Sequence, residues 1–156
     1  MMDQKRMILL VEDNDYDAEL ASRAFQRAKV KNPLVRVRDG VEALDYLFAR
    51  GQYAARDAHD QPVFVLLDLN IPKLSGLKVL EAIRKDERTR HLLVIVLTSS
   101  GEERDRLAAY HQFANSYVVK PLDYDRFVEA AQQMSLYWTE LNAPPPPMSL
   151  ASYDVV

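Results

Sequence analysis

Five polar residues of complementary chemistry each stand at the end of a short apolar run. Glu12 and Asp13 follow the first run, and Asp68 follows the third. Thr98 directly follows the fourth run, and Lys120 follows the fifth. If these runs are parallel strands of one sheet, their carboxyl ends lie along one edge, where three carboxylates, a hydroxyl and an ammonium group would meet. Crowded carboxylates repel one another unless a cation neutralises them, and oxygen-only ligands favour Mg²⁺, so the pattern predicts a magnesium site.

Together these residue types indicate phosphoryl chemistry. A carboxylate can attack a phosphoryl group to form an acyl phosphate, and Asp68 is the candidate nucleophile. Lys120 and the metal would offset charge on the phosphoryl oxygens, and Thr98 would donate a hydrogen bond to one of them. Taken alone, Glu12 and Asp13 could instead cap the N-terminus of a helix. The presence of Asp68 and Lys120 in the same pattern favours the metal site.

Alternating apolar runs and helical segments must position these residues. Apolar residues at helical spacing lie between the runs, and this alternation predicts an α/β fold: a doubly wound, five-stranded parallel sheet of order 2-1-3-4-5 with five helices. Arg36 and Arg38 alternate with valines, which predicts an edge strand with one wet face. The last helix has the clearest periodicity, from Phe127 through Trp138 to Leu141. The predicted strands are Met7–Val11, Leu34–Val37, Val63–Leu67, Leu93–Leu97 and Tyr117–Val119.

The composition is that of an ordinary globular domain. The chain has 156 residues and a formal net charge of −3, which gives no bulk attraction to nucleic acid. It has no cysteine, which excludes disulfides, thiolate catalysis and cysteine-ligated zinc. No apolar stretch approaches the roughly 18 residues of a membrane span, and no signal peptide is readable. We therefore expect a cytoplasmic protein that binds neither nucleic acid nor membrane.

Four motifs carry a resemblance to a known family. The segments LLVEDN, VLLDLNIP, VIVLTSS and SYVVKP resemble the motifs of the receiver domain of two-component response regulators, in the same order and each at the end of a predicted strand. The resemblance implies a flavodoxin-like receiver domain over residues 1–141, followed by a proline-rich tail over residues 142–156. It also implies that Asp68 accepts a phosphoryl group from a sensor histidine kinase.

The resemblance assigns roles to the other site residues. Asp13 would bind Mg²⁺ directly, Glu12 mostly through water, and the main-chain carbonyl of Asn70 would complete the protein ligands together with Asp68. Thr98 and Lys120 would bind the phosphoryl group. In this family an aromatic residue rotates inward on activation, and here it would be Tyr117. Pro121 would follow a cis peptide bond. Ser99 stands where many receivers have alanine, and Asn70 and Ser100 occupy two variable positions that tune acyl-phosphate hydrolysis.

A narrower resemblance concerns the partner. The long polar loop Gly51–Pro62 and the helix end SLYWTEL are similar to small response regulators that partner bacterial phytochromes. That implies a bacteriophytochrome as the histidine kinase, and a homodimer through the helix 4–strand 5–helix 5 face. The tail has apolar residues beyond Pro144–Pro147, and we expect it to dock on a second protomer because polyproline would hold it away from its own domain.

After the last helix only 15 residues remain, too few for an output domain, so output is expected through protein–protein interaction.

Two other functions stay open. An aspartyl-phosphate hydrolase on the same fold is the alternative, but such enzymes typically need a second aspartate at the position of Asn70. A scaffold that is never phosphorylated is a third possibility, and the acidic cluster argues against it.

Overall fold

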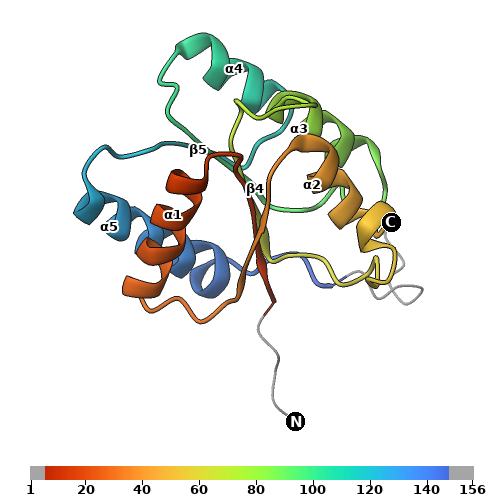
Figure 1. The fold of residues 1–156 in the computed structure, drawn as a ribbon, viewed down its shortest axis with the longest axis horizontal. Helices are drawn as coiled ribbons and strands as arrows, with labels where there is room; N and C mark the ends of the chain where they lie inside the picture. The colour runs from red at the N-terminus through yellow and green to blue at the C-terminus, as the bar shows by residue number, and fades with distance from the viewer. Residues whose placement is uncertain (1–5, 148–156) are drawn as a thin grey trace.

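The computed structural model describes residues 6–147, which form a five-stranded parallel sheet with helices on both faces (Figure 1). The strands are β1 (Ile8–Val11), β2 (Leu34–Val37), β3 (Phe64–Leu67), β4 (Val94–Thr98) and β5 (Ser116–Val119). The helices are α1 (Asp15–Arg27), α2 (Gly40–Leu47), α3 (Gly76–Lys85), α4 (Glu103–His111) and α5 (Tyr124–Ser135). A 3₁₀ turn, η1 (Gly51–Tyr53), follows α2, and a π-helical segment, η2 (Leu136–Leu141), continues α5. The strand order is β2-β1-β3-β4-β5, which confirms the predicted topology.

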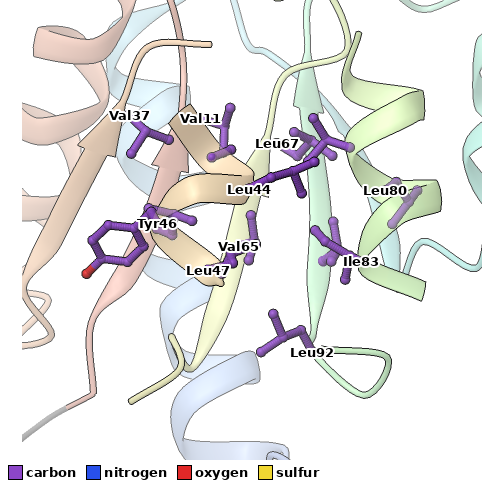
Figure 2. Close-up of a cluster of buried hydrophobic side chains, with 14 of the residues drawn as sticks. Val11, Val37, Leu44, Tyr46, Leu47, Val65, Leu67, Leu80, Ile83 and Leu92 are labelled. Atoms are coloured by element: carbon purple, nitrogen blue, oxygen red, sulfur yellow. The ribbon is translucent and has the colours of Figure 1, made fainter. Parts of the chain in front are cut away.

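The core has two layers, because successive residues of a strand point to opposite faces of the sheet. Under α2, α3 and α4, the strand residues Val11, Val65 and Leu67 face Leu44 of α2 and Ile83 of α3 (Figure 2). The other layer lies under α1 and α5. The three central strands are buried along their whole length, which explains why their sequences read as continuous apolar runs. Packing in these two layers holds the strands in place, and with them the carboxyl edge of the sheet where the predicted site residues lie.

The edge strands differ from the central ones as the sequence predicts. Three of the four residues of β2 are only half-buried, which confirms an edge strand with a wet face. Register along the sheet is regular: Val11 lies beside Leu67, and Thr98 lies beside Val119. The polar residues that follow these strands therefore come to one edge.

The end of the last helix departs from the predicted periodicity. Residues Leu136–Leu141 form π-helical turns, in which each hydrogen bond spans one residue more than in an α-helix, so the apolar face changes phase. Leu141, expected on the buried face, is 70% exposed. Trp138 is partly buried against the layer under α1 and α5, and its ring meets the Tyr137 ring edge-on at 4.8 Å.

Two segments outside the repeat pack on the domain. In the loop after α2, the Tyr53 hydroxyl donates to Glu42 at 2.6 Å, and the Arg56 guanidinium lies over the Tyr46 ring at 3.7 Å. In the tail, the carbonyl oxygen of Pro145 accepts a hydrogen bond from Arg6 at 3.0 Å. The polyproline segment itself thus contacts the domain. The apolar residues 148–156 of the predicted dimer arm (142–156), which we expect polyproline to hold away from the domain, lie outside the described residues.

Candidate functional site

Lys120 is the centre of the polar cluster at the carboxyl edge of the sheet. Its ammonium group donates to Glu12 Oε1 at 2.5 Å and to Asp68 Oδ2 at 3.0 Å, and its side chain is 12% exposed. Burial lowers the pKa of Lys120, but the carboxylates of Glu12 and Asp68 outweigh burial and raise that pKa above its ordinary value. Lys120 is therefore a fixed positive charge beside Asp68.

Asp68 is held from both sides of its carboxylate. One oxygen accepts from Lys120, and the other accepts from the main-chain N–H of Asn70 at 3.0 Å. The side chain is buried, at the end of a strand with no exposed residue. The peptide bond between Lys120 and Pro121 is trans, since residues 6–147 contain no cis peptide bond, so the expected cis bond is wrong. The trans form is intrinsically favoured before proline by about 0.5–1 kcal/mol.

The first helix begins without the acidic pair as its cap. Asn14 is the N-cap of α1, and its side-chain oxygen accepts from the main-chain N–H of Asp17 at 3.0 Å. The alternative that Glu12 and Asp13 serve as the cap is therefore wrong. Glu12 is buried and its carboxylate contacts Lys120, whereas Asp13 is exposed.

The predicted convergence of three carboxylates is only partly present. Within residues 6–147, no three acidic, histidine or cysteine side chains are grouped closely enough to hold a metal ion as they stand. Lys120 lies between Glu12 and Asp68, because buried carboxylates need a counter-charge and the ammonium group supplies it. Asp13 does not join them.

The donor set nevertheless suits a divalent cation. The Lys120 ammonium group is shared by three carboxylates, those of Glu12, Asp17 and Asp68. Asp13 follows Glu12 in the chain, so this edge of the sheet keeps an excess of negative charge. Burial raises the pKa of Glu12 above its ordinary value, and the nearby Asp68 charge adds to this rise, against the opposing effect of Lys120. Every candidate ligand offers oxygen, the atom that hard divalent cations prefer.

The loop after β4 joins two other predicted residues. Thr98 is fully buried, and its hydroxyl accepts from the main-chain N–H of Ser100 at 3.4 Å. The Tyr117 hydroxyl donates to the carbonyl oxygen of Ser100 at 2.9 Å, and its ring packs against the layer under α2, α3 and α4. Burial raises the pKa of Tyr117. The Ser100 hydroxyl donates to Asp105 of α4 at 2.6 Å, so one loop residue connects Thr98, Tyr117 and α4.

Three residues of the site were missed from sequence. Asp17 reaches Lys120 at 3.4 Å from the first turn of α1, where an acid reads as an ordinary partner of the helix dipole. Arg36 contacts the loop after β1 from the edge strand. Gly76 lies so close to the main chain after β3 that an added Cβ would be 2.4 Å from the carbonyl oxygen of Asp68. Of these three residues, only Asp17 has a signal in the sequence that could have placed it in the site: it lies five residues after Glu12.

Gly76→Ala should destabilise the protein by about 1–3 kcal/mol, the cost of overpacking, because the new methyl group meets the main chain at Asp68 and Leu69. Urea unfolding measures this change. Gly101→Ala is the matched control, since an added Cβ there meets nothing within 4 Å. Equal stability of the two variants would contradict the close approach of α3 to the main chain at Asp68 and Leu69.

This fold and this lysine-centred acidic edge define the class of receiver-like α/β proteins. A profile of the response regulator receiver domain matches residues 8–132, and the chain belongs to this family. The predicted family is thereby confirmed. No helix within residues 6–147 combines the length and the apolar character that crossing a membrane requires.

Three relatives illustrate the similarity. The probable methanogenesis regulatory protein FilR2 of Methanothrix harundinacea is 39% identical over 141 residues, which cover 90% of this chain and 88% of FilR2. Response regulator Rcp1 of Synechocystis sp. is 32% identical over 86% of this chain and 90% of its own length. The crystal structure of Rcp1 in its Mn²⁺-bound form matches with a TM-score of 0.81, over 90% of this chain and 99% of the Rcp1 chain. The crystal structure of RPA3017, a response regulator in red light signalling of R. palustris, is 38% identical with a TM-score of 0.84 over 90% of this chain and 99% of its own.

Proposed function

We propose that this protein is a single-domain response regulator that accepts a phosphoryl group on Asp68 from a sensor histidine kinase. The observation that carries the proposal is the buried Asp68 carboxylate, held by Lys120 at 3.0 Å with Thr98 at the end of the next strand. The hydrolase alternative loses support here, because Asn70 gives Asp68 a main-chain hydrogen bond and has no carboxyl group for acid–base catalysis.

The proposed chemistry is a single displacement at phosphorus. An oxygen of Asp68 attacks the phosphoryl group of a phosphohistidine, an O–P bond forms, the N–P bond breaks, and the imidazole leaves with the electron pair. Lys120 already lies beside Asp68, so its ammonium group would move to a phosphoryl oxygen with little reorganisation. Mg²⁺, held by Asp13, Asp68 and the carbonyl of Asn70 with Glu12 acting through water, would supply charge neutralisation on the phosphoryl oxygens.

The readout would pass through the loop after β4. A phosphoryl group on Asp68 would draw the Thr98 hydroxyl toward it, and Thr98 contacts Ser100, whose carbonyl holds Tyr117. Tyr117 is partly buried and bonded to Ser100 in this structure, and phosphorylation would stabilise this arrangement. The affected surface is the face formed by α4, β5 and α5.

The direct test is intact-mass spectrometry after incubation with acetyl phosphate and Mg²⁺. One phosphoryl group per chain is expected, in an alkali-labile form because an acyl phosphate hydrolyses readily. An unchanged mass under these conditions would contradict the proposal. Multiple turnover of a generic phosphate ester would instead favour the hydrolase.

We further propose a bacteriophytochrome as the kinase and a homodimer as the working form. Support for the kinase comes from RPA3017, which acts in red light signalling, and from the similarity to its structure. Support for the dimer is apolar exposure: Leu107 of α4 is 71% exposed, and Phe113 and Leu122, which precede and follow β5 in the chain, are also exposed. The tail beyond residue 147 would add contacts on the partner.

Leu107→Asp should shift the protein from dimer to monomer, because the new charge would have to be buried in the interface. Light scattering with size exclusion measures the mass. Val41→Asp is the control, since Val41 is an exposed apolar residue on α2, outside the proposed face. A chain ending at Leu141 tests the tail: an unchanged dimer would show that the tail is not the main contact.

A further inference from the structure

Arg36 makes an unusual set of contacts for a residue of an edge strand. Its Nε donates to the carbonyl oxygen of Glu12 at 3.0 Å, and its Nη2 donates to the carbonyl oxygen of Asp13 at 3.1 Å. Its remaining Nη1 donates to the Asp15 carboxylate at 2.8 Å. One planar guanidinium thus binds three of the four consecutive residues that lead from β1 into α1.

These contacts act where the sheet stops supporting the chain. The last main-chain bond between β1 and β2 runs from the N–H of Glu12 to the carbonyl of Val37 at 3.0 Å. Beyond it, within residues 6–147, no main-chain N–H of a neighbouring strand donates to the carbonyls of Glu12 and Asp13, and Arg36 supplies donors to both. The side chain is only 24% exposed, so these bonds are partly shielded from water.

We infer that Arg36 is a positioning residue for the divalent-cation site, holding the β1–α1 loop so that Glu12 and Asp13 project from a fixed main chain. The inference rests on the proposed function, in which these two carboxylates serve the cation. Residues that orient metal ligands from behind typically change metal affinity by about 10–100-fold when they are removed.

The ion pair with Asp15 does not explain this arrangement. Asp15 is largely exposed, and ion pairs of exposed carboxylates contribute little to stability. Arg38 provides the comparison, because it reaches the same Asp15 oxygen at 2.9 Å but is 60% exposed, and within residues 6–147 its side chain has no hydrogen bond to the β1–α1 main chain. Arg36 and Arg38 therefore share the charge and the ion pair, and differ in the two carbonyl contacts.

The two possible roles of Arg36, as a positive charge and as a support for the loop, predict opposite changes in Mg²⁺ affinity when the residue is replaced. If Arg36 acted only as a positive charge near the acidic cluster, its removal would tighten Mg²⁺ binding. If it positions the loop, Arg36→Gln should weaken binding by about tenfold despite the lost repulsion. Arg36→Lys should also weaken binding, because an ammonium group keeps the charge but cannot span both carbonyls in a fixed fork.

The test is isothermal titration calorimetry of full-length protein with Mg²⁺, together with hydrogen exchange of the β1–α1 loop in metal-free protein. Weaker binding and faster loop exchange in both Arg36 variants, with Arg38→Gln and Asp15→Asn close to the wild type, are expected. Unchanged or tighter binding in Arg36→Gln would overturn the inference, as would wild-type behaviour of Arg36→Lys. If the wild type binds no Mg²⁺, the proposed metal site fails, and loop exchange alone still decides whether Arg36 holds the loop.

Discussion

Asp68→Asn should take up no phosphoryl group from acetyl phosphate or from a phosphorylated histidine kinase. The amide has no anionic oxygen to attack phosphorus, whereas the wild-type carboxylate is held for attack between Lys120 and the N–H of Asn70. The shape of the side chain is kept, so the fold should survive. Intact-mass spectrometry with Mg²⁺ present measures the result as presence or absence of one phosphoryl group.

The control for this prediction is Asp17→Asn. Asp17 also contacts Lys120, at 3.4 Å, but it lies at the more exposed side of the cluster and is not a proposed acceptor. We expect this variant to be phosphorylated. Phosphorylation retained in Asp68→Asn would refute the acceptor assignment. Loss of phosphorylation in both variants would show that the reaction requires the acidic cluster as a whole and not Asp68 alone.

Lys120→Met should lower the free energy of unfolding by about 3–5 kcal/mol at neutral pH, because it removes the cation from a buried pair and leaves Glu12 and Asp68 uncompensated. The deficit should shrink as the pH falls. Burial already raises the pKa of Glu12 above its value in the unfolded chain. The loss of Lys120 removes an effect that lowers this pKa, so in the variant Glu12 binds a proton more readily in the folded state than in the unfolded state. Protonation of Glu12 therefore stabilises the variant relative to the wild type in acid.

Urea unfolding in metal-free buffer at about pH 7 and pH 5 measures both parts of this prediction. Lys78→Met is the matched control, since Lys78 is an exposed lysine whose ion pair with Glu81 lies on the surface of α3. Its expected effect is within about 0.5 kcal/mol. A Lys120→Met protein as stable as this control at neutral pH would show that the lysine does not compensate the buried carboxylates.

The sequence determined the topology and the membership of the site to a large extent. Each predicted strand agrees with the structure within one residue at either end, because a buried parallel strand must be continuously apolar and the polar residues after it mark where it leaves the sheet. Asp68, Lys120, Glu12 and Thr98 could be placed on one edge by that rule alone. The resemblance to the family motifs then supplied the roles expected of them.

Only the tertiary structure decided which groups touch. Asp17 reaches Lys120 from the first turn of α1, and Arg36 reaches two carbonyls because Leu10 and Arg36 are in register on neighbouring strands. Gly76 matters because α3 packs directly on the main chain at Asp68 and Leu69. These are contacts between segments far apart in the chain, and local spacing does not encode the distances on which they depend.

The same limit applies to Asp68 and to the tail. The sequence determined that a carboxylate would follow a buried strand beside other acids, since composition and period are local properties. The tertiary structure decided that Lys120 lies between Glu12 and Asp68 while Asp13 stays outside, and that Pro145 returns to Arg6. Burial sets those outcomes, because each carboxylate or carbonyl that loses water must find its partner among the groups that folding brings within reach.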